Sequence, residues 1–218
     1  MALTGGAARC QYLAVFVDGR ILPVAGARLV DERQIRLDLG GGGAIVVPLA
    51  RLDRVIADEV EVKPEPIAKP KCPPGFADEA LPPRTPFAAE ILAASREANL
   101  NPRLVAAVAE AESGFNPWAV SRVGAGGLMQ LMPSVWIEER LANPYEPRSN
   151  LAGGCSHLRK LLDRFGDLAL ALAAYNAGGA VVERAHGMPD YRETRGFVRR
   201  VLGRFCPEGA GQKGTVPP

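Results

Sequence analysis

A proline-rich segment divides this chain into two parts with different sequence patterns. Residues 60–84 contain seven prolines interleaved with charged residues. Proline fixes φ and lacks a backbone N–H, so a helix or central strand cannot run through such a segment, and an extended tether is expected. Cys72 and Phe76 are unusual in a solvated linker, so the segment could instead pack along the second part. The predicted division is 1–59, a linker at 60–84, a second domain at 85–206 and a flexible tail at 207–218.

The part before the linker is predicted to be a small β domain. Asp18-Gly19 lies between YLAVFV and RILPVA, and Asp-Gly supplies the positive φ angles of a two-residue hairpin turn. The runs QIRLDL and AIVVPL flank residues 40–43, so four or five strands could form a small sheet or open barrel. The N-terminal residues MALTGGAARCQYLAVFV lack a basic cluster before the apolar run, which favours a first strand over a signal peptide. A binding or spacer role and a structural cap remain alternatives.

Beyond the linker the apolar spacing becomes helical. Thr85 and Pro86 are predicted as the N-cap and first residue of a helix, and Asn101 and Pro102 repeat this signal. Later helices are expected at 133–141, 151–165, 167–176 and 193–205. The predicted fold class is therefore α+β, with a small N-terminal β domain followed by an all-α domain.

Composition excludes some kinds of partner. The 26 Lys and Arg residues nearly balance 24 Asp and Glu residues, and a formal charge of +2 does not call for nucleic acid. No apolar run approaches the roughly 20 residues of a membrane span. The four cysteines lack C-x-x-C spacings, so neither a metal site nor a redox motif is predicted. They could be free thiols or form disulfides in any of three full pairings; they are Cys10, Cys72, Cys155 and Cys206.

One glutamate is predicted on the apolar face of a helix. In the helix that begins near Asn101, Leu104, Val108 and Glu112 share one stripe, whereas Glu110 points to roughly the opposite side. Burial and the negative end of the helix dipole both favour the protonated form of Glu112. A general acid for glycosidic cleavage needs such a raised pKa. The alternative is a buried glutamate in a structural salt bridge or hydrogen-bond network.

Sequence blocks around Glu112 carry a family resemblance. Glu112 begins the string ESGFNPWAVSRVGAGGLMQLMP, and NLAGGCSHLRKLLDRFGDLALALAAYNAG and PDYRETRGFVRRVL follow in order. Together these blocks resemble the soluble lytic transglycosylase domain of bacterial cell-wall enzymes. The resemblance covers about residues 87–202, which is nearly the whole second domain.

The resemblance implies a lysozyme-like helical fold with a sugar groove. Glu112, of the Glu112-Ser113 pair, matches the sole acid/base of the family, and Tyr175 matches the tyrosine that hydrogen-bonds and orients it. Groove and supporting positions are matched by Ser121, Gln130, Met132, Asn176 and Glu193, the last a supporting acid and not a nucleophile. Ordinary structural roles are the alternatives: a core thioether for Met132, a packed ring for Tyr175, a surface amide for Gln130 and a turn for Ser121.

Two positions depart from the family pattern. Phe197 stands where the family usually has tyrosine, which removes a hydroxyl group. His157 also replaces a common tyrosine and is expected to be a partly buried packing residue and not a base.

The resemblance also implies a reaction. The expected activity is non-hydrolytic cleavage of the MurNAc-β-1,4-GlcNAc bond of peptidoglycan, with 1,6-anhydroMurNAc ends and no metal or organic cofactor. The expected location is the periplasm or cell envelope, with any export signal upstream or missed in choosing the start codon. The β domain could bind a cell-envelope protein. A hydrolytic lysozyme-like muramidase and a non-catalytic peptidoglycan-binding scaffold are the alternatives.

Overall fold

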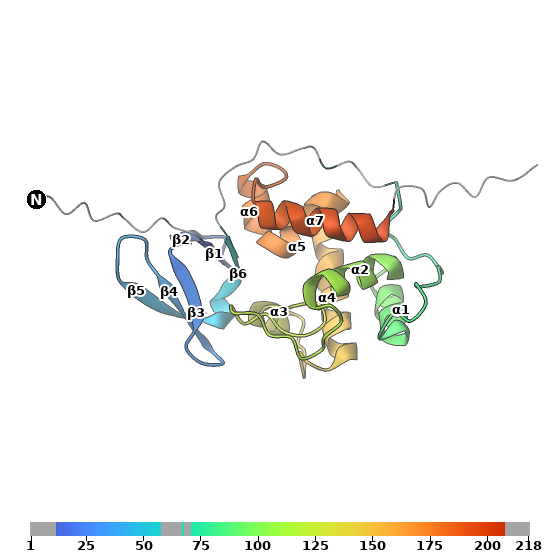
Figure 1. The fold of residues 1–218 in the computed structure, drawn as a ribbon, viewed down its shortest axis with the longest axis horizontal. Coiled ribbons are helices and arrows are strands. Elements are labelled where there is room, and N and C mark those ends of the chain that lie inside the picture. The colour runs from blue at the N-terminus through green and yellow to red at the C-terminus, as the bar shows by residue number, and fades with distance from the viewer. Residues whose placement is uncertain (1–11, 58–66, 68–70, 208–218) are drawn as a thin grey trace, which may run out of the picture.

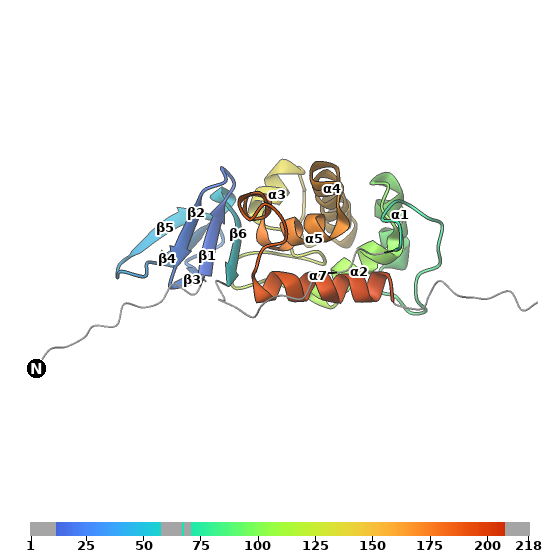
Figure 2. The ribbon, with the colours of Figure 1, turned by 90° about the horizontal axis from the view of Figure 1, so that it is seen from above.

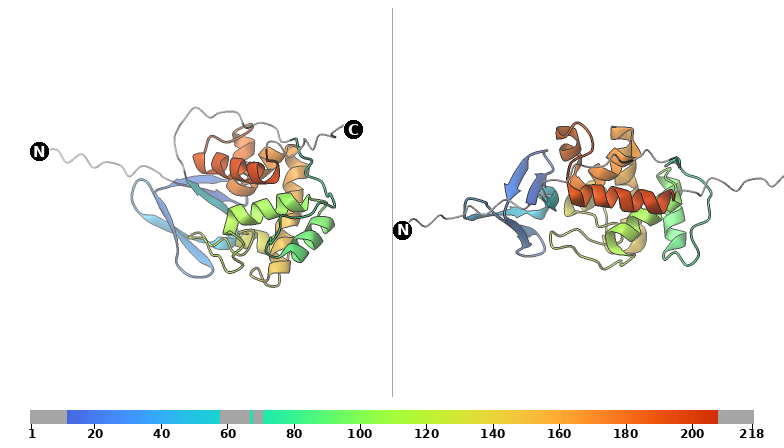
Figure 3. Two further views of the ribbon diagram at one scale, coloured as in Figure 1. Left: turned by 45° about the vertical axis from the view of Figure 1, so that its right-hand side comes forward. Right: turned by 45° about the horizontal axis from the view of Figure 1, so that its top comes forward.

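The computed structural model describes residues 12–57, 67 and 71–207. Its strands lie in two antiparallel three-stranded sheets, with the orders β2-β1-β6 and β3-β4-β5. The strands are β1 (Tyr12–Phe16), β2 (Ile21–Val24), β3 (Gly26–Leu29), β4 (Gln34–Asp38), β5 (Ala44–Pro48) and β6 (Leu52–Ala57), with the 3-10 helix η1 (Leu49–Arg51) before β6. The sheets lie at one side of a helical domain (Figures 1 and 3). The predicted α+β class is confirmed.

The first hairpin differs in detail from the prediction. β1 and β2 pair as expected, but the Phe16 N–H donates to the Arg20 carbonyl (2.8 Å) and the Gly19 N–H to the Phe16 carbonyl (2.9 Å). Only Gly19 in this loop has a positive φ, at 82°. The predicted two-residue turn is therefore wrong, because one left-handed residue in a longer loop suffices. The first residues, including Cys10, lie outside the described part of the chain.

The helices are α1 (Ala88–Glu97), α2 (Pro102–Ser113), α3 (Pro133–Glu138), α4 (Pro147–Phe165), α5 (Leu168–Ala177), α6 (Gly179–Arg184) and α7 (Arg192–Phe205). The predicted start of α2 is confirmed, since the Asn101 side chain accepts from the Arg103 N–H and Pro102 is the first helical residue. The predicted cap at Thr85 is wrong: its hydroxyl donates to the Pro82 carbonyl (2.7 Å) in a preceding turn. Helix α6 lies in a segment for which no helix was predicted from the sequence.

The helical domain is organised around α5, whose sequence LALALAAYNA is apolar on nearly every side. A helix of that kind has no face suited to water and must be enclosed. It packs against α4, α6 and α7, and Figure 2 shows it in the middle of the helical domain. None of the described helices is both long enough and apolar enough to span a membrane.

The β domain shares its hydrophobic contacts with the helical domain. Met132 and Ala125 belong to the cluster that fills the space between the sheets. Ala177 and Val181 form another cluster with residues of β1 and β6, among them Ile56. Separating the two domains would expose these apolar surfaces to water, so the β domain is packed as part of one body and not as a tethered module.

The described end of the proline-rich segment lies along the helical domain. Cys72 and Cys206 form a disulfide, with Cα atoms 5.7 Å apart, and Cys155 is a buried free thiol. The Asn101 N–H donates to the Pro74 carbonyl (2.7 Å), and Phe76 lies under the Arg96 guanidinium. This part of the segment is not a solvated tether, as its cysteine and phenylalanine had suggested.

The disulfide should contribute strongly to stability because it closes a long loop. Its cysteines are 134 residues apart in sequence, and chain-entropy arguments give about 5 kcal/mol for loops of this order. We expect Cys206→Ser to lower the free energy of unfolding by an amount of that order in urea denaturation. Reductant should lower the stability of the wild type equally and leave the variant unchanged. Equal stability of the oxidised wild type and the variant would contradict this assignment.

Candidate active site

Glu112 lies in the last turn of α2, just before the left-handed C-cap Gly114 (φ 60°). The residue is half-buried, and its Oε1 is enclosed with no hydrogen-bond partner among the described residues. Glu110 instead forms an ion pair with Arg204 at the surface, with 2.9 Å between the Glu110 Oε2 and the Arg204 Nε. The helical phase predicted from the sequence is confirmed: one acid faces inward and its neighbour faces water.

Burial controls the acidity of Glu112. Removal of the carboxylate from water raises its pKa from 4.5 to about 7, and the charge of Glu193 adds to this effect. The charges of Arg54 and, more weakly, Arg200 act in the opposite direction. A carboxyl group with a pKa near neutrality can both donate a proton and take one back, which suits general acid–base catalysis.

Tyr175 occupies the centre of the site but makes a different hydrogen bond from the one implied by the resemblance. It is fully buried, and its hydroxyl donates to the Met129 carbonyl (2.8 Å) and not to Glu112. Burial and the charge of Glu112 both raise the Tyr175 pKa, so the phenol stays protonated. The His157 ring lies beside it, with centroids 5.5 Å apart.

His157 is a packing residue, as expected from the sequence. Burial, together with the charge of Arg54, lowers its pKa to about 4. It is therefore neutral at physiological pH. Phe197, the other departure from the family pattern, is fully buried in the helical core and needs no polar partner there.

Gln130, one of the matched positions, shapes the loop that follows α2. Its backbone is left-handed (φ 46°), and its buried Nε2 donates to the carbonyls of Ala119 and Gly127, each at 3.0 Å. It is not a surface amide. Its side chain fixes the fold of the loop from inside.

Ser113 and Ser121 hold the same loop. The Ser113 hydroxyl donates to the Leu128 carbonyl (2.8 Å), which ties the end of α2 to the loop. The Ser121 Oγ accepts from the N–H groups of Val123 and Ala125, as in a turn. These serines position the backbone around Glu112.

The remaining matched positions differ in exposure. Met132 is 0% exposed and packs among the β-domain residues, so in this structure it is the core thioether and does not line a groove. The reason is that the β domain covers it. Asn176 has a buried Oδ1 without a hydrogen-bond partner among the described residues. Glu193 is exposed in the first turn of α7, and its Oε2 accepts from the Ala57 N–H (3.5 Å).

Arg54 was not identified from the sequence. It lies on β6, is only 9% exposed, and its guanidinium stands 5.4 Å from the centroid of the Tyr175 ring. A signal was present, because alternation along LDRVIA places this arginine on the same strand face as Leu52 and Ile56. A charge on the apolar face of a strand is uncommon and indicates a specific role.

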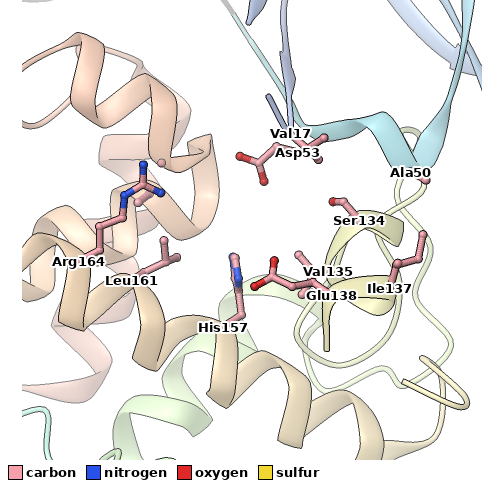
Figure 4. Close-up of a pocket in the computed structure, with 12 residues that line it drawn as sticks. Val17, Ala50, Asp53, Ser134, Val135, Ile137, Glu138, His157, Leu161 and Arg164 are labelled. Atoms are coloured by element: carbon pink, nitrogen blue, oxygen red, sulfur yellow. The ribbon is translucent and has the colours of Figure 1, made fainter. Parts of the chain in front are cut away.

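A cavity of about 390 Å³ lies between the β domain and helices α3, α4 and α5. In Figure 4 the Asp53 carboxylate points from the β domain into this cavity, and the Glu138 carboxylate lies beside the His157 ring. Burial raises the pKa of Asp53. Glu112 does not line the cavity, but His157 connects the two regions through its contact with Tyr175.

The described residues contain no group of three or more His, Cys, Asp or Glu side chains that could hold a metal ion. At the site itself, the titratable group with a pKa near neutrality is the carboxyl group of Glu112. Among enzymes, a carboxylic acid of raised pKa is the feature of glycan-cleaving catalysts that protonate a leaving oxygen.

Comparison with known proteins identifies the family. Residues 90–197 match the family model for the Transglycosylase SLT domain, and the chain belongs to this family through that domain. It is 51% identical over 86 residues to a transglycosylase of Enterobacteria phage PRD1, covering 39% of this chain and 32% of that protein. It is 35% identical over 134 residues to a putative soluble lytic murein transglycosylase of Haemophilus influenzae, covering 50% of this chain and 22% of the relative.

A solved structure agrees with the sequence matches. An inactive mutant of lytic transglycosylase Slt from Pseudomonas aeruginosa superposes with a TM-score of 0.52 and 28% identity, over 56% of this chain and 24% of that one. The chain thus spans about a third or less of the length of these relatives. The relatives share the helical domain and extend well beyond it.

The raised pKa of Glu112 predicts a dependence of stability on pH. Because its folded pKa of about 7 exceeds the ordinary 4.5, the stability contributed by the protonated group is complete below pH 4.5 and is lost as pH rises through 7. The loss is on the order of 3 kcal/mol. Glu112→Gln cannot ionise, so we expect it to be more stable than the wild type at pH 8, with a smaller difference at pH 4.5.

Urea denaturation at both pH values measures this difference. Glu110→Gln is the matched control, since it removes only a surface ion pair, and should show no gain at pH 8. A Glu112→Gln variant without a pH-dependent gain would show that the carboxylate is well solvated.

Proposed function

We propose that this chain is a lytic transglycosylase that cleaves the MurNAc-β-1,4-GlcNAc bond of peptidoglycan and leaves 1,6-anhydroMurNAc ends. The observation that supports this most is Glu112, a single inward-facing acid with a pKa near 7 within a transglycosylase SLT domain. Relatives named lytic murein transglycosylase carry the same domain. The P. aeruginosa Slt structure is of an inactive mutant in which glutamine replaces a glutamate. The cellular location that fits this substrate is the periplasm or cell envelope.

The proposed reaction uses one group twice. Protonated Glu112 gives its proton to the glycosidic oxygen, and the bond from that oxygen to C1 of the muramyl sugar breaks. The resulting carboxylate then takes the proton of the muramyl C6 hydroxyl, whose oxygen bonds to C1 and closes the anhydro ring. Water is not consumed, and Glu112 ends in its starting state. A pKa close to 7 suits both steps.

The surrounding residues have supporting roles in this proposal. Tyr175 is anchored by its bond to Met129, and its ring forms a rigid wall beside the acid. Gln130, Ser121 and Ser113 hold the loop that follows α2. The unpartnered Oδ1 of Asn176 can accept a hydrogen bond from a sugar hydroxyl or amide.

A hydrolytic muramidase is the second candidate. Glu193 favours it, because its charge acts on Glu112 and a hydrolase needs a second group that directs water. The two reactions share the first proton transfer and differ only in the nucleophile that attacks C1.

Substitution of Glu112 tests the proposed acid. Glu112→Gln is nearly isosteric but has no acidic proton, so turnover of purified peptidoglycan should fall by at least about 10³-fold. Glu110→Gln should retain near wild-type turnover. Release of soluble muropeptides measures both, with circular dichroism to confirm folding. Equal losses in the two folded variants would contradict the assignment, and an active Glu112→Gln would exclude this acid altogether.

The products distinguish the transglycosylase from the muramidase. Cleavage in ¹⁸O-water should leave the new muramyl ends unlabelled, because their second ring oxygen comes from C6 of the sugar. These ends should resist borohydride and be lighter than hydrolysed ends by one water, about 18 Da. Mass spectrometry of the muropeptides provides the measurement. Heavy oxygen at C1 together with reducible ends would identify a muramidase instead.

A further inference from the structure

Strand β6 contacts two separate parts of the helical domain. Alternation places Leu52, Arg54 and Ile56 on one face of the strand, and all three are buried. Leu52 belongs to the cluster that includes Met132, and Ile56 to the cluster that includes Ala177. Figures 1 and 2 show β6 as the strand nearest the helices. Arg54 is thus held between two apolar contacts at the centre of the domain interface.

The Arg54 side chain brings a positive charge into this interface. It is 9% exposed, and none of the ion pairs among the described residues includes it. Enclosing a cation without a carboxylate is costly. The favourable contact in its place is with the Tyr175 ring, whose face attracts a cation. A cohesive interface between domains would not need a charge at this position.

Charged groups from three elements act on Glu112. The charges of Arg54 on β6 and of Glu193 and Arg200 on α7 act on the pKa of Glu112. The charge of Glu112 acts in turn on the pKa of Tyr175 on α5. Of the two cations, Arg54 has the larger effect. The same strand reaches the site again at its end, where the Ala57 N–H donates to Glu193.

We propose that Arg54 is a positioning residue of the Glu112 centre, supplied by the β domain. Its guanidinium lies over the Tyr175 ring and holds it by a cation–π contact, and its charge stabilises the carboxylate that Glu112 becomes after giving up its proton. The β domain is then part of the active site and not a spacer or cap. This proposal rests on the proposed function, since it assigns Arg54 a part in that reaction.

Three variants test the proposal by their pH profiles. Arg54→Met removes the charge and should lower kcat by about ten- to a hundredfold. It should also move the alkaline limb of the kcat/KM profile to higher pH, because loss of the cation raises the pKa of Glu112. Arg54→Lys keeps the charge but not the broad guanidinium group over the Tyr175 ring. The alkaline limb of its kcat/KM profile should therefore stay near the wild-type position, and its kcat should fall less than that of Arg54→Met. Arg51→Met, which alters an exposed arginine of the same domain, should behave as the wild type.

Each result decides the matter. A folded Arg54→Met with the wild-type limb and rate would overturn the proposal. An increase in its turnover would also overturn it, by showing that the β domain merely obstructs the glycan. If Arg54→Met does not fold, Arg54→Lys provides the test. A wild-type kcat in Arg54→Lys would then overturn the proposal that the guanidinium group holds the Tyr175 ring.

A second readout does not need catalysis. In ¹³C-glutamate-labelled protein, the Glu112 carboxyl signal, assigned by its loss in Glu112→Gln, should titrate at higher pH in Arg54→Met than in Arg51→Met. This result would stand even if the wild type failed to cleave peptidoglycan, so failure of the proposed function and failure of the Arg54 proposal are distinguishable. An unchanged titration would overturn the electrostatic role of Arg54.

Discussion

The site depends on the enclosure of one carboxyl group at the end of an apolar helix. Glu112 follows a run of buried residues on α2, so the helix that secures the core also fixes the acid. Loss of hydration is the main cause of its raised pKa, and the nearby charges adjust that value. The acidity of the group is thus a consequence of packing, and any change that admits water to α2 will change it.

The same requirement explains the polar groups around the acid. An enclosed carboxyl group needs a rigid environment, and the loop after α2 obtains it from side chains that bond to its own carbonyls, above all Gln130. Tyr175 is fixed in turn by a carbonyl of this loop. Several residues matched by family resemblance, among them Gln130 and Tyr175, therefore build the shape of the site.

The β domain alters the context of a familiar helical fold. It covers Met132 with apolar strands and brings Arg54 against Tyr175. A lysozyme-like domain without this addition would leave both Met132 and the Tyr175 ring more open. The structure therefore places residues that precede the proline-rich segment against the core of the helical domain.

The sequence by itself determined the features that depend on local periodicity and capping. The helical phase of α2 distinguished Glu112 from Glu110, and Asn101 with Pro102 gave the start of that helix, because both signals act within a few residues. The ordered sequence blocks likewise gave the family. The Asp18-Gly19 pair was enough to predict the first hairpin, although not the length of its turn.

Tertiary structure alone decided which distant residues meet. The pairing of Cys72 with Cys206 joins positions 134 residues apart, and the bond from Tyr175 to Met129 spans 46. Arg54 and Tyr175, which also meet, lie in different domains of the chain. Such contacts depend on how complete elements pack, and periodicity within one element carries no information about its partner. For that physical reason the sequence identified the acid, whereas only the fold showed what surrounds it.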